Sequence, residues 1–273
     1  MAVDHYENFP VASVLLPAPL REPVAAIYGF ARSADDFADE GDLPPEQRRK
    51  LLAGYQAELD AIEQGRPTQH PVFLRLRPVI ERYDLPLQLF RDLLDAFMQD
   101  VGKDRYRDFP ELMDYCRRSA DPVGRLLLHL FGHATAENLT RSDAICSALQ
   151  LINFWQDFSR DGPNGRLYVP QSDLDAHGVA ASDVLACRDS PAARALIRDL
   201  CGWARQLMLD GAPLALTLRG RAGWELRLVV QGGLAILDKI ATRGHDSLLH
   251  RPRVGARDVP RLAWRALTMR PTS

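Results

Sequence analysis

Apolar side chains recur at intervals of three and four residues along most of the chain, the spacing that places them on one face of an α-helix. Prolines and glycines that typically begin and end helices separate these stretches. The three clearest faces are Leu20, Val24, Ile27, Tyr28 and Ala31; Leu52, Tyr55, Leu59 and Ile62, ended by Gly65; and Leu89, Leu93, Phe97 and Val101. Each stretch therefore predicts an amphipathic helix.

Further helices are predicted over about 110–134, 142–160, 191–218 and 222–243. Ser142 and Asp143 are suitable N-caps for the second of these, and the Gly- and Pro-rich stretch 161–172 predicts an ordered loop. Alternating apolar segments joined by tight turns, which would predict strands, are not evident. The pattern predicts an all-α fold of eight to ten helices, one domain over residues 1–273, and a helical bundle of this kind can enclose a central cavity.

Composition narrows the class of protein. The 273 residues are 46% hydrophobic, which is enough for a large core and excludes a disordered chain. The 34 basic residues nearly balance 36 acidic ones, which argues against a nucleic-acid partner. No apolar run approaches the ~18 residues of a membrane span, and the first residues lack a secretory signal pattern. The four cysteines have no paired spacing. We expect a cytoplasmic globular protein.

Two acidic rows are the candidates for chemistry. The first acidic row is Asp35, Asp36 and Asp39; Asp35 and Asp39 are four residues apart and share a helix face. The second acidic row is Asn153, Asp157 and Asp161, spaced four and four, with Gln150 one turn before it. The two rows are far apart in sequence, as opposed walls of a helical cavity would be.

Like charges stacked along a helix destabilise it, so each row calls for a compensating partner. Mg²⁺ accepts hard oxygen ligands and commonly bridges carboxylates to a substrate phosphate. The alternative is that both rows are ordinary solvated acidic faces paired with Arg32, Arg160 or Arg166. The amides of Gln150 and Asn153 lie among apolar neighbours and fit that alternative less well.

Four segments, in order, resemble the squalene/phytoene synthase family, which joins prenyl diphosphates head to head. They are LLPAPLREPVAAIYGFARSADDFADE, which contains the first acidic row; YCRRSADPVG, from Tyr115 to Gly124; the second acidic row; and the following RLYVP, from Arg166 to Pro170. The resemblance covers roughly residues 5–255 and implies an all-α isoprenoid-synthase-like fold acting on a prenyl diphosphate.

The resemblance also implies roles for individual residues. Mg²⁺ ions, bound together with the diphosphate, would be held by Asp35, Asp36, Asp39, Asn153, Asp157 and Asp161. The residues expected to be catalytic are Asp35, Asp39, Asp157, Asp161, Tyr28 and Tyr115. Those expected to bind diphosphate are Arg32, Arg166, Tyr168 and Arg251, the last of which is equally compatible with a solvated basic patch that includes Arg243 and Arg253. Those expected to line the substrate pocket are Phe9, Ala120, Val123, Gly124, Leu127, Gln150, Phe154 and Gly233.

Within the family, the opening ENFPVAS most resembles the hydroxysqualene synthases of hopanoid-making bacteria. This resemblance implies conversion of presqualene diphosphate and water to hydroxysqualene and diphosphate, without a redox cofactor. Functional pairing with a presqualene diphosphate synthase is expected, and the apolar substrate suggests peripheral contact with the inner membrane. Two alternatives stay open: complete squalene or phytoene synthase activity from two prenyl diphosphates, and a non-catalytic protein of this family type that binds lipid or a partner.

The chain departs from the family pattern at two positions. Gln156 stands where many members have arginine, so that a diphosphate contact is missing or supplied elsewhere. Gly233 stands where many have tyrosine, and we predict that it leaves space for a water beside the final cation. A competing metal site, His129, His133 and Glu137, has the spacing of one helix face and could ligate zinc or iron.

Overall fold

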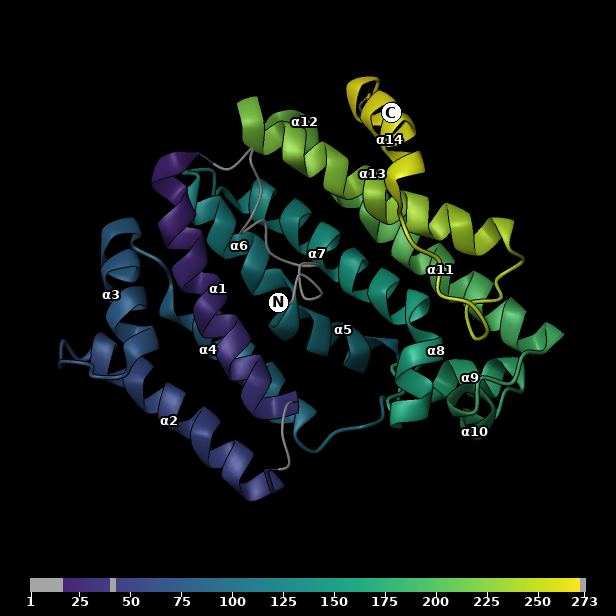
Figure 1. Cartoon of the computed structure of the whole chain (residues 1–273), viewed down its shortest axis with the longest axis horizontal. Helices are drawn as coiled ribbons and strands as arrows, with labels where there is room; N and C mark the ends of the chain where they lie inside the picture. Colours follow the sequence, from purple (N-terminus) through teal and green to yellow (C-terminus); the bar gives the residue numbers. More distant parts are fainter. Residues whose placement is uncertain (1–16, 40–42, 271–273) are drawn as a thin grey trace. The chain divides into compact units, whose positions relative to one another are not determined.

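The computed structural model describes residues 17–39 and 43–270, and these form helices and connecting segments without a strand (Figure 1). The prediction of an all-α fold is therefore confirmed. The α-helices and two 3₁₀-helices are α1 (Ala18–Asp39), α2 (Pro45–Glu63), α3 (Pro71–Tyr83), α4 (Leu87–Asp100), α5 (Phe109–Ser119), α6 (Asp121–Leu130), α7 (Ala136–Gln156), α8 (Phe158–Asp161), η1 (Gly162–Asn164), α9 (Gln171–His177), α10 (Ala181–Leu185), α11 (Pro191–Gly211), α12 (Leu214–Thr217), α13 (Gly220–Thr242), η2 (Ala256–Asp258) and α14 (Val259–Leu267).

The helices are more numerous and shorter than the predicted eight to ten, because prolines interrupt two of the long stretches. The predicted helix over 110–134 is two helices, α5 and α6. Pro122 lies in the first turn of α6, where its missing N–H costs nothing, whereas inside one continuous helix its ring would clash with the preceding turn. The predicted helix over 191–218 is likewise interrupted at Pro213, between α11 and α12. Proline therefore shortened helices whose apolar spacing continued across it.

The predicted start of the helix over 142–160 is wrong. Helix α7 begins at Ala136, and Thr135 is its cap: the backbone N–H of Asn138 donates to Thr135 Oγ1 at 3.3 Å. Ser142 is a buried residue inside the helix, not its N-cap. The polar residues before Ser142 concealed the true start, because the first turns of α7 carry little apolar periodicity.

The described residues divide into two compact units. Unit 1 comprises the described parts of 1–103 and 117–139, and unit 2 those of 104–116 and 140–273. The single domain over 1–273 and the central cavity stay predictions. None of the described helices is both long enough and apolar enough to cross a bilayer.

Helix α1 is the central helix of unit 1 and packs on α2, α3 and α4. Phe30 of α1 is fully buried and meets the ring of Phe73 at 5.7 Å and that of Phe90 at 5.3 Å, both edge to face. This packing fixes the helix that carries the first acidic row.

In unit 2, α7 packs closely against α11 and α13 at two glycines. A Cβ on Gly211 of α11 would lie 2.6 Å from the carbonyl oxygen of Arg141 in α7. A Cβ on Gly233 of α13 would lie 3.2 Å from Cδ1 of Ile152 in α7. At Gly211 the neighbour is backbone, so a larger side chain does not fit and this contact fixes the position of α7 and of the second acidic row at its end. At Gly233 the neighbours are the ends of side chains, which can move more easily.

Candidate functional site

The first acidic row lies in the last turns of α1. Arg32 contacts two of its carboxylates: Nη1 lies 3.2 Å from Asp35 Oδ2, and Nη2 lies 2.6 Å from Asp36 Oδ1. This pairing with Arg32 is the one that the alternative interpretation of an ordinary acidic face expects, and a role of Arg32 in binding diphosphate stays a prediction. Asp39 is the last residue of the helix, and its side chain lies outside the described parts of the structure. Arg32 thus supplies part of the compensation that the stacked charges require, and a metal role for this row stays a prediction.

The second acidic row lies at a break between two helices of unit 2. Helix α7 ends at Gln156, Asp157 has non-helical angles (φ −100°, ψ 11°), and α8 begins at Phe158. The backbone N–H of Asp157 still donates to Asn153 O, and that of Asp161 to Asp157 O, each at 2.9 Å. These bonds keep the spacing of four residues through the break, so the row stays on one side of the chain.

Arg251, from the segment after α13, forms a two-point ion pair with Asp157. Its Nε contacts Oδ1, and Nη2 donates to Oδ2 at 3.0 Å. The two side chains are 13% and 10% exposed, so the pair is nearly desolvated. A planar guanidinium in this arrangement is suited to carboxylate and phosphate alike. Arg251 is therefore bound to the second acidic row, and its side chain also lines a cavity together with Arg243 and Arg253.

Gln156 holds the segment that carries Arg251. Its Nε2 donates to the carbonyl oxygen of Pro252 at 2.6 Å, and both residues are buried. Gln156 thus fixes the residue after Arg251, while Arg251 binds the residue after Gln156. Sequence reasoning recorded Gln156 as a departure and missed this link, because 96 positions separate the two partners and no local pattern reports such a contact.

Asp161 is the most perturbed carboxyl in the row. Burial, followed by the neighbouring Asp157 charge, raises the pKa of Asp161 from 3.8 to about 6 against the opposing effects of Arg166, Arg160 and Arg251. The donors here are carboxylate and amide oxygens, the ligand type that Mg²⁺ prefers, and a divalent cation would offset their charge. The chemistry of this donor set therefore fits Mg²⁺. In the described residues, however, no three His, Cys, Asp or Glu side chains are already grouped as a metal site.

Replacing Asp161 by asparagine is expected to raise the melting temperature of the metal-free protein by ~2–4 °C near neutral pH, because the amide avoids the cost of burying a charge beside Asp157. Since its folded pKa is raised, Asp161 destabilises the fold fully above about pH 6, and this penalty disappears as the pH falls towards 3.8. Thermal unfolding with EDTA, followed by circular dichroism at both ends of this range, measures the effect. Equal melting temperatures for variant and wild type above pH 6 would contradict it.

Four aromatic rings of unit 2 gather beside the second acidic row. Tyr168 stacks on Phe154 with ring centroids 3.7 Å apart and planes at 7°. Tyr115 lies 6.4 Å from Phe154 and 6.3 Å from Tyr168, measured between centroids. Tyr106, 3% exposed, lies 5.6 Å from Tyr115 and 6.1 Å from Tyr168. We call these four residues the aromatic cluster; its π faces are suited to stabilising a cation.

Tyr106 was missed by sequence reasoning. It stands in the polar stretch GKDRYRDF, and the one signal for it is an isolated aromatic among charged residues. Its carbonyl oxygen accepts the N–H of Gln171 at 2.8 Å, and Arg107 O accepts that of Ser172 at 3.0 Å. The segment that follows Tyr168 is therefore tied to the loop before α5. Arg166, at the exposed start of this segment, donates its N–H to Asp161 O at 3.0 Å.

The remaining predicted pocket residues are divided between the units. Gln150 is half-buried on α7 in unit 2. In unit 1, Val123 belongs to the apolar core, with Tyr28 and Leu127 packed against it, while Ala120 and Gly124 are buried at the start of α6. Phe9 lies outside the described residues. Their roles at a substrate stay predictions.

The prediction of open space at Gly233 is wrong. A Cβ there would lie 2.9 Å from Met208 Cε, 3.2 Å from Ile152 Cδ1 and 3.3 Å from Leu149 Cδ2. The glycine lets three helices approach one another, and the ends of these side chains fill the space that a water would need. A tyrosine there would act first on packing, so Gly233→Tyr does not report on product choice alone.

The alternative metal site is not supported. His129 is in the last turn of α6, which ends at Leu130, and Gly132 has a φ of +70° that turns the chain away from the helix. His133 follows in the connecting segment, and Glu137 is in the first turn of α7. The three residues do not share a helix face, which was the basis of that interpretation.

The model of the family described as squalene/phytoene synthase matches residues 2–259. Hydroxysqualene synthase of Rhodopseudomonas palustris is 36% identical over 239 residues, covering 87% of this chain and 80% of that protein. Hydroxysqualene synthase of Sinorhizobium fredii is 34% identical over 242 residues, with coverages of 88% and 80%. Phytoene synthase of Thermus thermophilus is 33% identical over 254 residues, with coverages of 92% and 85%.

Solved structures agree with these similarities. The crystal structure of squalene synthase HpnC from Alicyclobacillus acidocaldarius superposes with a TM-score of 0.81 at 38% identity, covering 88% of this chain and 90% of that one. A dehydrosqualene synthase has a TM-score of 0.80 at 22% identity, covering 97% and 92%, and supports the fold alone. The family match, the relatives and the shared fold lead to one conclusion: the chain belongs to the squalene/phytoene synthase family.

Proposed function

We propose that the protein converts presqualene diphosphate and water to hydroxysqualene and diphosphate. The observation that carries the proposal is the second acidic row, in which Arg251 binds Asp157, burial raises the pKa of Asp161, and four aromatic rings lie alongside. Two relatives named hydroxysqualene synthase, each matched over more than four fifths of this chain, support the choice of substrate and product.

The reaction needs no oxidant or reductant. The bond between the substrate carbon and the diphosphate oxygen breaks, and its electron pair leaves with diphosphate. The resulting cyclopropylcarbinyl cation rearranges, the oxygen of water forms a bond to carbon, and that water loses a proton. The protein must therefore stabilise negative charge on the leaving group and positive charge on carbon, while admitting one water.

The residues of unit 2 suit both tasks. Mg²⁺, when bound, would supply positive charge to the departing diphosphate. Asn153, Asp157 and Asp161 would hold it, and Arg251 can donate two hydrogen bonds to diphosphate oxygens when released from Asp157. The aromatic cluster offers π faces to the cation and excludes bulk water around it. Arg166 and Tyr168 lie on the segment tied to Tyr106, where they can close over the diphosphate.

The first acidic row is proposed to bind Mg²⁺ as well. Arg32 holds two of its carboxylates, those of Asp35 and Asp36, at hydrogen-bond distance. In this proposal Arg32 transfers one of its contacts to a diphosphate oxygen, and Asp35, Asp36 and Asp39 take metal as ligands. Tyr28, half-buried on the same helix, is proposed to face the substrate.

A second candidate is complete squalene or phytoene synthase activity. The phytoene synthase of Thermus thermophilus matches 92% of this chain at 33% identity, which favours keeping it. Product analysis with farnesyl or geranylgeranyl diphosphate, with and without NADPH, separates the two. Squalene or phytoene from these substrates would support the second candidate, and their absence supports dependence on a separate presqualene diphosphate synthase.

Incubation of the purified protein with presqualene diphosphate and Mg²⁺ tests the proposed function. We expect hydroxysqualene and diphosphate, and loss of turnover when EDTA removes the metal, because Mg²⁺ offsets the charge of the leaving group. Recovery of unreacted substrate would overturn the assignment. Asp39→Ala and Asp157→Ala test the non-catalytic alternative, since a lipid- or partner-binding protein should keep its function after either change.

A further inference from the structure

Helix α14 leaves large apolar side chains in solvent although it packs on a neighbouring helix. Leu262 and Ala266 are buried and face α13, beside which α14 lies (Figure 1). Trp264 is 67% exposed and Leu267 65%, the two highest values among the described large apolar residues. Val259, at the first turn, is 56% exposed. A short helix that buries only two residues and exposes Trp and Leu has an unpartnered apolar face.

The exposed apolar residues of α14 and its basic residues lie on different sides of the helix. At about 100° per residue, Pro260, Trp264 and Leu267 fall within about 60° of one another on one flank of the helix. Arg261 and Arg265 lie on the adjoining flank, about 100° and 140° round the helix from Pro260, and both line a cavity. The buried residues separate the two flanks on one side, and solvent borders them on the other. Apolar and basic groups are therefore available together to a surface that α14 lies on.

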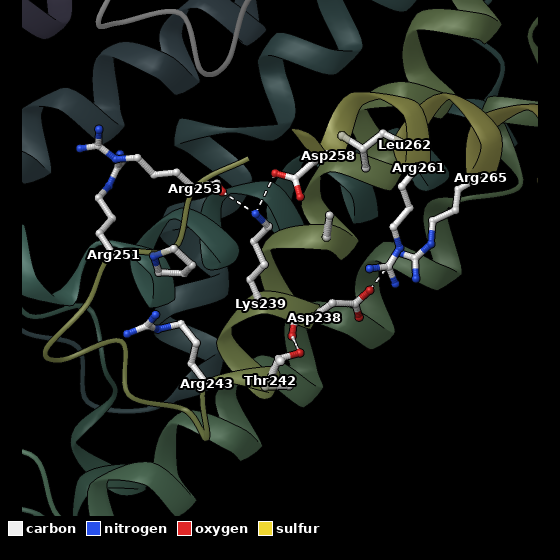
Figure 2. A pocket seen from close by; sticks show the side chains of 13 residues that line it. Asp238, Lys239, Thr242, Arg243, Arg251, Arg253, Asp258, Arg261, Leu262 and Arg265 are labelled. Carbon is white, nitrogen blue, oxygen red and sulfur yellow. Dashed lines mark hydrogen bonds and ion pairs between the residues drawn. The ribbon is translucent and has the colours of Figure 1, made fainter. Parts of the chain in front are cut away.

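The cavity has a volume of about 810 Å³ and lies between the end of α13, the segment before η2, and α14. Figure 2 shows that its basic side chains come from all three elements. Six of its lining residues are basic and two are acidic: Lys239, Arg243, Arg251, Arg253, Arg261 and Arg265 against Asp238 and Asp258. Lys239 and Arg265 pair with these two acidic residues, while Arg243 and Arg251 pair with Asp246 and Asp157 outside the lining. The excess positive charge of the cavity therefore comes from Arg253 and Arg261, and it favours an anionic partner.

Some of these basic residues form ion pairs within the cavity, and others form none among the described residues. Lys239 Nζ donates to Asp258 Oδ2 at 2.7 Å and to Arg253 O at 2.8 Å, which fixes the segment before α14 (Figure 2). Arg265 Nη1 donates to Asp238 Oδ2 at 2.9 Å. The side chains of Arg253, Arg257 and Arg261 are exposed and make no ion pair within the described part of the chain. Fixed backbone thus presents free guanidinium groups next to α14.

We propose that α14 and the adjoining cationic cavity dock the protein on an anionic lipid bilayer. Trp264 and Leu267 enter the boundary between headgroups and acyl chains, where tryptophan is favoured, and Arg253, Arg257 and Arg261 bind lipid phosphates. A nucleic acid or an acidic protein would bind the arginines but would not explain the exposed Trp264 and Leu267. A bilayer explains both groups of residues. The inference goes beyond the proposed reaction and does not depend on it.

Vesicle flotation of the full chain, without substrate, tests this docking surface. We expect binding to vesicles of phosphatidylcholine with phosphatidylglycerol at least about tenfold tighter than to phosphatidylcholine alone, and weaker at high salt. The variants Trp264→Ser with Leu267→Ser, and Arg257→Glu with Arg261→Glu, should each weaken binding by about tenfold or more. All four side chains are on the surface, so melting temperatures should stay close to that of wild type.

Helix α3 offers matched controls, since Leu74 is 56% exposed and the neighbouring Arg75 is exposed as well. Leu74→Ser and Arg75→Glu should bind the anionic vesicles as wild type does. Wild-type binding by both α14 variants would overturn the proposal. So would a loss confined to the arginine variant, because that result describes an anion site without insertion into a bilayer. Activity is not the readout, so failure here leaves the proposed reaction intact.

Discussion

Asp157→Asn is expected to reduce turnover of presqualene diphosphate by about a thousandfold, the largest effect of any single substitution in unit 2. The asparagine keeps the shape of the side chain but removes a charge that Mg²⁺ would need and that Arg251 binds at two points. The loss should appear in kcat at saturating Mg²⁺, because the missing interaction acts on the charge that develops as diphosphate leaves. Single-turnover measurement of hydroxysqualene formation, with Mg²⁺ varied, gives the comparison.

A structural effect of Asp157→Asn must be separated from the chemical one. Arg251 is only 13% exposed, so loss of its partner destabilises the fold as well. The double variant Asp157→Asn with Arg251→Gln removes both charges and should recover much of the melting temperature but none of the turnover. Asp175→Asn is the matched control: its carboxylate, on exposed α9 of the same unit, accepts a hydrogen bond from Gln171. An Asp157→Asn variant that is folded and keeps more than about a tenth of wild-type turnover would contradict the role.

Gln156→Leu is expected to lower turnover by about a hundredfold. Leucine cannot donate to Pro252 O, so the buried carbonyl loses its partner and the segment that places Arg251 is free to move. Gln156→Glu keeps the size but puts a second acceptor against that carbonyl, and should be at least as damaging. We treat Gln156 as a positioning residue, since it acts through Arg251.

A double-mutant cycle distinguishes positioning from a general loss of stability. If Gln156 acts through Arg251, then Gln156→Leu should add little to the loss already caused by Arg251→Gln. Gln206→Leu is the control, because Gln206 also donates to an oxygen of its own unit, Asp210 Oδ1 at 2.8 Å, but on an exposed face. Fully additive losses in turnover would show that Gln156 does not act through Arg251.

Local spacing predicted the parts of the site that depend on one helix. The i, i+4 pattern of Asn153, Asp157 and Asp161 holds because backbone bonds continue through the break at Asp157. Arg32 contacts Asp36 for the same reason, since four residues span one turn. The sequence also placed Tyr168 and Phe154 near the second acidic row, although the stacking of one on the other needed coordinates.

Long-range packing decided what spacing could not. Gly233 was interpreted as open space because the sequence does not tell whether a glycine borders a cavity or a neighbouring helix. In the structure, the side chains of Met208 and Ile152 occupy the position. The histidine site was predicted on the assumption that one helix contains all three residues. In the structure the chain turns at Gly132, after the end of the helix that carries His129. At Gly233 the helix was predicted correctly but its packing neighbour was not. At the histidines the polar spacing was correct but the end of the helix was not.

The sequence by itself determined the all-α fold class, the family and the two acidic rows, because helix periodicity and motif order depend on residues close together in the chain. Tertiary structure decided which groups lie against the second acidic row. Arg251 reaches Asp157 across 94 positions, and Gln156 reaches Pro252 across 96. It also decided that Trp264 and Leu267 remain exposed while Leu262 and Ala266 are buried, because only the packing of α14 on α13 selects which apolar face is covered.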